Sequence, residues 1–214
     1  MKRNELMSLI RFLVLLIPMA LLTGCMTKQS IVSSSNDFKP ASSQESQRTQ
    51  YRIGLVMNRA MDAEVARFVT QKGGLTYDFE FKVGQDIRKT LPIYLNSFVD
   101  TVPIKTISDG GAYDFVLRAK ISSSLFTYIE MSAAPRYELS ITLDVQVIKD
   151  GSIRERFLVK KDSRVEISAF ENGDAERTDT MRRKYEEQIM TIYNELEVLL
   201  KEYLTLSKLH KRVD

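Results

Sequence analysis

The chain has 214 residues, of which 43% are apolar and 28% are charged, and its formal net charge at pH 7 is +3. Lys2, Arg3 and Arg11, offset by Glu5, account for +2 of this charge, so the chain beyond residue 24 is nearly neutral. Nucleic-acid binding depends on a clustered excess of lysine and arginine, so this balance speaks against it. A single cysteine and a single histidine exclude a disulfide within the chain, histidine triads and multi-histidine metal sites.

Residues 1–24 have the pattern of a bacterial lipoprotein signal peptide. A positively charged start precedes an apolar run that is too short for a spanning helix of about 20 apolar residues. The run ends at Leu22-Thr23-Gly24-Cys25, a leucine and two small residues before the only cysteine, which is the arrangement of a lipobox. Cleavage after Gly24 would expose Cys25 for lipidation. An ordinary secretory signal with an accidental cysteine and an uncleaved anchor helix are the alternatives.

Lipidation of Cys25 predicts a stable membrane anchor and a location. Several acyl chains, palmitate among them, hold firmly because each buried methylene contributes about 0.8 kcal/mol. In lipoproteins of Gram-negative bacteria, an aspartate after the cysteine resembles an inner-membrane retention signal, and here Met26 occupies that place. We therefore expect a protein anchored in the outer membrane with its domain facing the periplasm, if the source is Gram-negative.

Residues 25–50 are expected to be the lipidated cysteine and a flexible linker. The segment is rich in serine, asparagine and glutamine and poor in apolar residues. Such a composition buries too little apolar surface to order itself. A coil of about 25 residues spans roughly 25–30 Å, which is enough to clear the lipid headgroups.

A folded domain is predicted over residues 51–205, and it begins with strands. The first strand is expected over 51–57. Residues 62–71 are ambiguous between a helix and a strand that enters a hairpin at the following glycine pair. Strict alternation of aromatic and charged residues then predicts a half-buried strand over 77–83.

A helix is expected after this strand, over residues 85–99, because apolar residues recur at spacings of three and four. Pro92 conflicts with a regular helix, since proline removes one hydrogen bond and clashes with the preceding turn at about 3 kcal/mol. The helix is either kinked or begins near Thr90, which would put Pro92 in its first turn. A short strand over 101–107 and a turn over 109–111 are expected to follow.

The clearest alternation predicts a three-stranded antiparallel meander. One strand covers 115–121, the next covers 139–147, and the last returns over 153–167. Asp150-Gly151 suits the positive φ angles of a type I′ hairpin turn. Charged residues along the last strand indicate a face in water or an edge protected against pairing.

A long amphipathic helix is expected to close the domain, capped by Thr178 or Thr180. Residues 206–214 are expected to be a basic, frayed tail. Two helices that flank a meander can pack together on one face of the sheet, which predicts an α+β two-layer sandwich with an antiparallel, mixed-edge sheet. The apolar stripe of the final helix consists of Met181, Tyr185, Ile189, Ile192, Leu196, Leu199 and Tyr203.

The sequence offers no convincing catalytic constellation. Carboxylate chemistry would need Asp78, Glu80 and Asp144 to converge, but alternation along strands already explains these residues as solvent-facing charges. No glycine-rich phosphate loop precedes a helix. We therefore expect a protein that is not an enzyme and binds no cofactor or metal.

The segment from Ser122 to Arg136 is unusually apolar for a connection between strands. It is either a strand that overhangs the sheet and exposes an apolar patch to a partner, or a longer hairpin that is fully packed. Under the first alternative the partner-binding residues are Phe126, Tyr128, Ile129 and Met131.

The lipobox, the polar linker, the strand order, the turn at Asp150-Gly151 and the long final helix together resemble the YajG-like lipoproteins of the outer membrane. The order of elements is also similar to that of small α+β lipoproteins that assist envelope transport systems. The resemblance covers roughly residues 51–203, and it implies a non-enzymatic role with Cys25 as the only functional residue carried over.

Two functions are compatible with these patterns. The first is a non-catalytic, membrane-anchored lipoprotein whose periplasmic domain binds a protein partner in an envelope assembly or transport complex. The second is an auxiliary subunit or carrier that holds a lipid or another apolar ligand between the sheet and the helices. An apolar cavity of several hundred Å³ at that interface would favour the second function.

Overall fold

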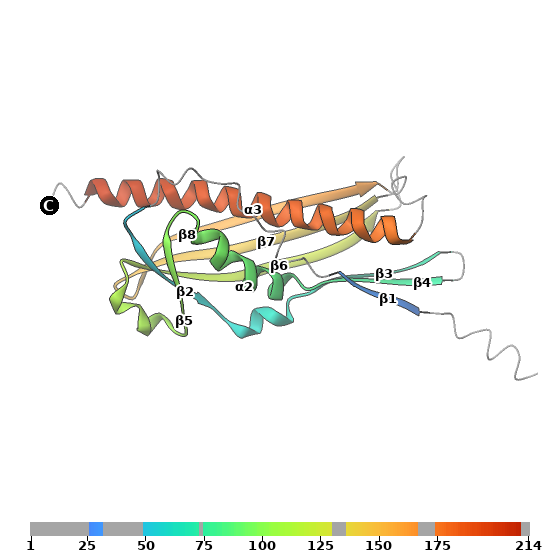
Figure 1. Cartoon of the computed structure of the whole chain (residues 1–214), viewed down its shortest axis with the longest axis horizontal. Helices are drawn as coiled ribbons and strands as arrows, with labels where there is room; N and C mark the ends of the chain where they lie inside the picture. The colour runs from blue at the N-terminus through green and yellow to red at the C-terminus, as the bar shows by residue number, and fades with distance from the viewer. Residues whose placement is uncertain (1–25, 32–48, 73–74, 130–135, 167–173, 211–214) are drawn as a thin grey trace, which may run out of the picture. The chain divides into compact units, whose positions relative to one another are not determined.

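A computed structural model describes residues 26–31, 49–72, 75–129, 136–166 and 174–210 of the chain (Figure 1). The predicted signal peptide and Cys25 lie outside these residues. The described chain divides into two compact units. Residues 26–29 and Val69–Phe79 belong to the small unit, and the remaining described residues belong to the large one.

A five-stranded sheet with the order β5-β2-β6-β7-β8 forms the centre of the large unit. β2 (Arg52–Met57) runs parallel to both of its neighbours, β5 (Asp100–Ile104) and β6 (Phe115–Ile129). β6, β7 (Arg136–Lys149) and β8 (Ser152–Glu166) form an antiparallel meander. The α+β class is therefore confirmed, with a mixed sheet.

The predicted meander is present, and its first hairpin is longer than the alternation suggested. Asp150 and Gly151 form the β7–β8 turn with φ angles of 53° and 72°, as a type I′ turn requires. β6 does not stop at Ile121. It continues to Ile129 through an irregularity in pairing between Ile121 and Ser123, which adds one residue to β6 relative to β7.

Two α-helices belong to the large unit, and the longer one lies along the meander (Figure 1). α2 spans Val83–Leu95 and α3 spans Asp174–His210. α3 begins before the predicted caps at Thr178 and Thr180. It also continues through residues 206–210, so this part of the predicted frayed tail is helical, while 211–214 lie outside the described residues.

Pro92 lies inside α2, so the alternative in which the helix begins near Thr90 is wrong. The helix ends at Leu95, and the amide of Asn96 donates to the carbonyl oxygen of Pro92 over 3.1 Å. Pro92 therefore sits in the last turn, where its missing amide removes a single hydrogen bond from the helix.

Two short 3₁₀ helices connect the elements. η2 (Arg59–Ala63) follows β2, and η3 (Ile107–Ala112) replaces the predicted end of a strand and turn. Asp109 holds η3 because its carboxylate accepts from the amide of Thr106 over 2.9 Å and its own amide donates back to Thr106 over 3.2 Å. This local capping favours a helical turn over an extended strand.

A second sheet has the order β1-β4-β3. β3 (Ala66–Lys72) and β4 (Leu75–Phe81) show that the ambiguous segment enters a hairpin as a strand. β1 (Met26–Ile31) lies in the segment predicted to be a flexible linker, so that prediction is wrong for these six residues. An edge strand needs backbone partners more than apolar side chains, which explains why composition missed it. Residues 32–48 lie outside the described residues.

A ladder of buried hydrogen bonds joins α2 to α3. The hydroxyl of Tyr185 donates to Asp86 Oδ2 over 2.8 Å. One helical turn along, Thr90 donates its hydroxyl proton to the carbonyl oxygen of Asp86, so the hydroxyl of Tyr193 is the donor in its 2.7 Å contact with Thr90 Oγ1. Tyr94 continues the ladder toward Asn194 and Glu197. Burial raises the pKa of Tyr185 and Tyr193, which keeps both hydroxyls protonated as donors.

We expect Tyr185→Phe to lower the free energy of unfolding by about 1–2 kcal/mol. The substitution removes a donor from the buried Asp86 carboxylate while it preserves the ring. Urea denaturation followed by circular dichroism measures the change. Tyr203→Phe, at a half-buried tyrosine whose ring packs on Phe115, is the matched control and should change the free energy by less than about 0.5 kcal/mol. Equal effects of the two substitutions would contradict the role of the Asp86 bond.

No helix in the described parts of the chain is both long enough and apolar enough to cross a membrane.

Candidate functional site

The predicted partner-binding residues are distributed between the interior and the surface. Phe126 is buried, whereas Tyr128 and Ile129 are half-buried at the end of β6. Met131 lies outside the described residues. Phe126 is therefore part of the core in this structure. Partner contact through Tyr128, Ile129 and Met131 stays a prediction.

An aromatic cluster surrounds Phe126. Its ring lies edge-on to Phe68 at 5.3 Å and to Phe81 at 5.2 Å between ring centroids. Tyr137, the cross-strand neighbour of Tyr128, completes the cluster at 5.7 Å from Phe126. Contacts of this kind contribute about 0.5–1.5 kcal/mol each beyond burial. Among the described residues, the packed-hairpin alternative accounts for this part of the segment.

Two members of this cluster, Phe68 and Tyr137, were not among the residues predicted from the sequence to bind a partner. Phe68 lies on the segment that was ambiguous between helix and strand, and its side chain meets Phe126 only because β3 pairs in a hairpin. Tyr137 was placed next to the predicted loop. Its alternation with Leu139 and Ile141 was the available sign that it faces the core.

The interface between α3 and the sheet leaves almost no empty space. A cavity of about 10 Å³ remains there, which is at the lower limit of what one water molecule occupies. Its walls come from β4, the meander and α3. This cavity therefore has no room for an apolar ligand of the size that the carrier function requires. The lining residues include Phe81, Phe126, Tyr137, Leu139, Met181 and Tyr185.

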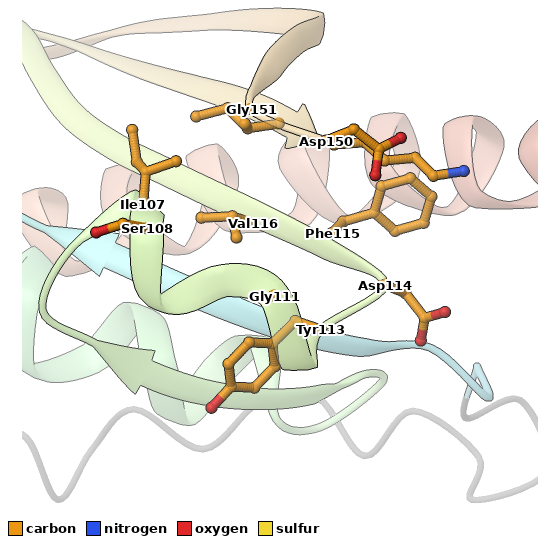
Figure 2. A pocket seen from close by; sticks show the side chains of 11 residues that line it. Ile107, Ser108, Gly111, Tyr113, Asp114, Phe115, Val116, Asp150 and Gly151 are labelled. Carbon is orange, nitrogen blue, oxygen red and sulfur yellow. The ribbon is translucent and has the colours of Figure 1, made fainter.

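A surface pocket of about 440 Å³ lies where the β7–β8 turn meets η3 (Figure 2). Asp150 and Gly151 form one wall, and Ile107, Ser108 and Gly111 of η3 form another. Phe115 and Val116 at the start of β6 also line the pocket, so it lies between the turn, η3 and the first residues of β6.

The charges near this pocket are held by structural contacts. Asp114 Oδ2 accepts from the backbone amide of Arg52 over 3.0 Å, which ties the start of β2 to the start of β6. Lys149 Nζ lies 5.8 Å from the centre of the Phe115 ring, and the Arg52 guanidinium lies 5.2 Å from that of Tyr113. These contacts hold the charged groups at the end of the sheet.

A larger and more open groove, of about 750 Å³, lies between the chain before β2 and the C-terminal half of α3. The hydroxyl of Tyr51 donates to the carbonyl oxygen of Leu204 over 3.3 Å and links the two walls. Burial, with Asp114 nearby, raises the pKa of Tyr51. Lys201 and Lys208 line the opposite wall. The groove has one acidic and two basic side chains, so its charge is modest.

The sheet face that points away from α3 is polar, and we call it the open face. Alternation along the strands assigns its members, because α3 contacts the other face through Gln188 and Tyr203. Gln188 donates to the carbonyl oxygens of Leu139 and Lys161 over 2.8 and 2.7 Å. From Arg118 to the far end of the meander, the open face comprises Arg118, Lys120, Ser123, Leu125, Thr127, Ile129, Arg136, Glu138, Ser140, Thr142, Asp144, Gln146, Arg156, Leu158, Lys160, Asp162, Arg164 and Glu166.

Asp144 is the centre of the open face. Its side chain has 0% exposure, yet it accepts two hydrogen bonds from Arg156, of 3.0 and 2.9 Å, and lies 3.3 Å from Lys120 Nζ. Burial by itself would raise the pKa of Asp144, but hydrogen bonds from Arg156 and Lys120 outweigh it and hold the pKa below the ordinary 3.8. The interpretation of Asp144 as a solvent-facing charge is therefore wrong.

The three carboxylates considered for catalysis have different surroundings. Asp78 is buried in the small unit, Glu80 is half-buried, and Asp144 is held in ion pairs. Within the described ranges, no group of three or more His, Cys, Asp or Glu side chains could hold a metal ion.

Comparisons with known proteins find likeness in backbone alone. No protein-family model matches the chain, and no curated protein matches its sequence. A Xanthomonas campestris protein of family DUF330 has a TM-score of 0.45 and 13% identity, and the match covers 79% of this chain and 91% of that one.

Two further solved structures are similar. One, from Helicobacter pylori, is provisionally described as a homolog of the neuraminyllactose-binding hemagglutinin, with a TM-score of 0.47, 13% identity, and coverage of 79% and 96%. The other is a hypothetical protein of Chlamydia trachomatis with a TM-score of 0.41, 11% identity, and coverage of 68% and 96%. Likeness at this level assigns neither family nor function, so the resemblance to YajG-like lipoproteins stays a prediction.

Proposed function

We propose that this chain is a non-catalytic, membrane-anchored lipoprotein whose domain binds a protein partner in a cell-envelope assembly or transport complex. The observation that carries the proposal is the filled interior. The cavity between α3 and the sheet measures only about 10 Å³. We therefore place the binding surface for a partner on the outside of the large unit. This packing favours partner binding over the carrier function.

The membrane anchor in this proposal is Cys25. The residues that support it are the lipobox and the charged, apolar segment before it. Met26 supports the outer membrane, with the domain on the periplasmic side. The anchor holds the domain within reach of envelope proteins, which raises the effective concentration of any partner in the same compartment.

The rim of the aromatic cluster is the proposed contact for a protein partner. Tyr128 and Ile129 are half-buried at the end of β6, and the chain continues from them to Met131. Tyrosine is enriched in protein interfaces because it offers a rigid apolar ring and a polar hydroxyl. The rings of Phe68 and Tyr137 pack against the Tyr128 ring, at 6.0 and 5.3 Å between ring centroids.

We expect Cys25→Ser to release most of the protein from the membrane fraction, because serine cannot form the thioether to lipid. Fractionation of urea-washed membranes, with metabolic labelling by a palmitate analogue, measures the loss. Met26→Ser keeps the lipobox and is the matched control, which should stay membrane-bound and labelled. Unchanged membrane attachment of the Cys25→Ser protein would contradict the anchor.

Partner binding has its own test, chemical crosslinking in intact cells of the tethered chain and the Cys25→Ser chain side by side. The proposal expects one envelope protein to be recovered with the tethered form and lost with Tyr128→Ala. Recovery of lipid alone would contradict partner binding and return the carrier function to first place.

A further inference from the structure

We infer that the open face of the meander docks on the surface of a bilayer that contains anionic phospholipid. The inference rests on the proposed membrane anchor, which places the domain near such a surface, and it adds a second, non-covalent contact. Its basis is the distribution of charge and apolar side chains on this one face.

The open face is cationic, whereas the domain around it is not. Six of its members are Lys or Arg and four are Asp or Glu, so the face has a net charge of +2. Residues 49–210 as a whole contain 23 Lys and Arg against 24 Asp and Glu. The rest of the domain therefore carries a compensating negative charge, and the charge of the domain is distributed asymmetrically, with its positive side at the open face.

Two carboxylates of the face, Asp144 and Glu138, are recessed beneath cations, whereas Asp162 and Glu166 on β8 are exposed. Asp144 is fully buried under Arg156 and Lys120, whose side chains are about half exposed. Glu138 is 23% exposed and lies between Arg136 at 3.0 Å and Arg164 at 2.9 Å. Asp144 and Glu138 thus each join two cations into a triad of net charge +1, and at these two triads an approaching surface meets the cations first.

The two triads are spaced along the strand, and each holds its cations in position. Eight residues of β7 separate Glu138 from Gln146, which is about 27 Å of extended chain. Arg118 marks the far end of this row, where its Nε donates to Gln146 Oε1 over 3.0 Å. Cations arranged over this length can meet the phosphates of several lipid headgroups at the same time.

Two large apolar side chains project between the cations. Leu125 on β6 is 56% exposed, and Leu158 on β8 is 55% exposed. Leucine among lysine and arginine is the composition of protein surfaces that lie at the boundary of headgroups and acyl chains.

An acidic protein is the competing occupant, and the composition of the face argues against it. Aromatic side chains, tryptophan and tyrosine above all, are enriched among the anchors of protein interfaces. Among the residues that define the open face, none is aromatic, because Phe126, Tyr137 and Phe157 of the same strands point to the covered face. A face that combines cations with exposed leucines and has no aromatic side chain fits a lipid surface better than a protein surface.

Tryptophan fluorescence tests the docking directly, because the chain contains no tryptophan. The full lipidated chain with Leu125→Trp is reconstituted into phosphatidylcholine vesicles with and without phosphatidylglycerol. The inference expects the emission of the new tryptophan to shift to shorter wavelength in the anionic vesicles at low salt, and the shift to disappear at high salt. Val198→Trp, at a position on α3 that is equally exposed, is the matched control and should show no shift.

Charge removal provides the second measurement. Lys120→Gln, Lys160→Gln and Arg164→Gln together remove three exposed cations, while Arg156 still pairs with Asp144 and Arg136 with Glu138. Each charge near an anionic surface is worth about fivefold in partitioning, so the triple variant of the Cys25→Ser chain should bind anionic vesicles about 100-fold more weakly. The control triple variant carries Lys89→Gln, Arg182→Gln and Arg183→Gln.

The outcomes separate the docking from the anchor. Flotation of the lipidated chain with vesicles reports the anchor at Cys25, whereas the tryptophan at position 125 reports the face. A chain that floats while its tryptophan emission stays unshifted in anionic vesicles overturns the docking and leaves the anchor intact. A shift produced by poly-glutamate and not by vesicles overturns the lipid assignment in favour of an acidic protein.

Discussion

Gly84→Ala is expected to lower the free energy of unfolding by about 3 kcal/mol or more, an effect at the upper end of those seen for overpacking. A Cβ at this position would lie 1.5 Å from the carbonyl oxygen of Met61. That oxygen belongs to backbone, which cannot turn aside as a side chain can. The amide of Gly84 also donates to the carbonyl oxygen of Glu64 over 3.0 Å, so the first turn of α2 is tied to η2.

Neighbouring hydrogen bonds hold η2 in place, so it cannot easily move away from a Cβ added at position 84. Met61 accepts from the amide of Glu64 over 2.8 Å, and Arg88 forms two hydrogen bonds to Asp62, of 2.6 and 2.7 Å. Urea denaturation measures the loss. Gly111→Ala is the matched control, since nothing lies within 4 Å of its added Cβ, and it should change the free energy by less than about 0.5 kcal/mol. Similar stability of the two variants would show that η2 does not approach α2 as described.

Asp144→Asn is expected to lower the free energy of unfolding by about 2 kcal/mol at neutral pH. The amide keeps the shape of the carboxylate, but it loses the charge that Arg156 and Lys120 contact and presents an NH₂ group toward Arg156. Hydrogen bonds to a buried charged group contribute about 1.5–3 kcal/mol, which sets the magnitude. Asp162→Asn on the same face, where the carboxylate is half-exposed, is the control and should have little effect.

The same carboxylate predicts how stability depends on pH. The pKa of Asp144 is lower in the folded chain than its ordinary 3.8, so the folded state favours the ionised form. Its contribution is fully present above the unfolded pKa and is lost as the pH falls through the folded pKa. The advantage of the native chain over Asp144→Asn should therefore shrink below about pH 4. An advantage that is constant from neutral pH to pH 2 would contradict the ion pair.

Local patterns in the sequence were sufficient for the meander and for the long final helix. Alternation along β7 and the Asp150-Gly151 turn are properties of neighbouring residues, and so is the three- and four-residue spacing along α3. The lipobox and its implied anchor are also read from adjacent residues, although Cys25 lies outside the described chain. Patterns of this kind need no knowledge of distant partners.

Other features depend on residues far apart in the chain, and local patterns did not predict them. Gly84 lies between the predicted strand over 77–83 and the predicted helix over 85–99, and no local pattern indicated that η2, some 20 residues earlier, passes against it. β1 is a strand because β4 offers it an edge, although its own composition is that of a linker.

The candidate surfaces follow the same division. Phe126 belongs to the interior because β3 and β4 bring Phe68 and Phe81 to it, so an apolar run that could have been exposed is packed. The sequence by itself determined that alternate residues of the meander are polar, and hence that the sheet has one face in water. Only the tertiary structure decided how those charges combine, because cross-strand register places Lys120 and Arg156 on either side of Asp144 and so leaves this carboxylate buried beneath its two cations.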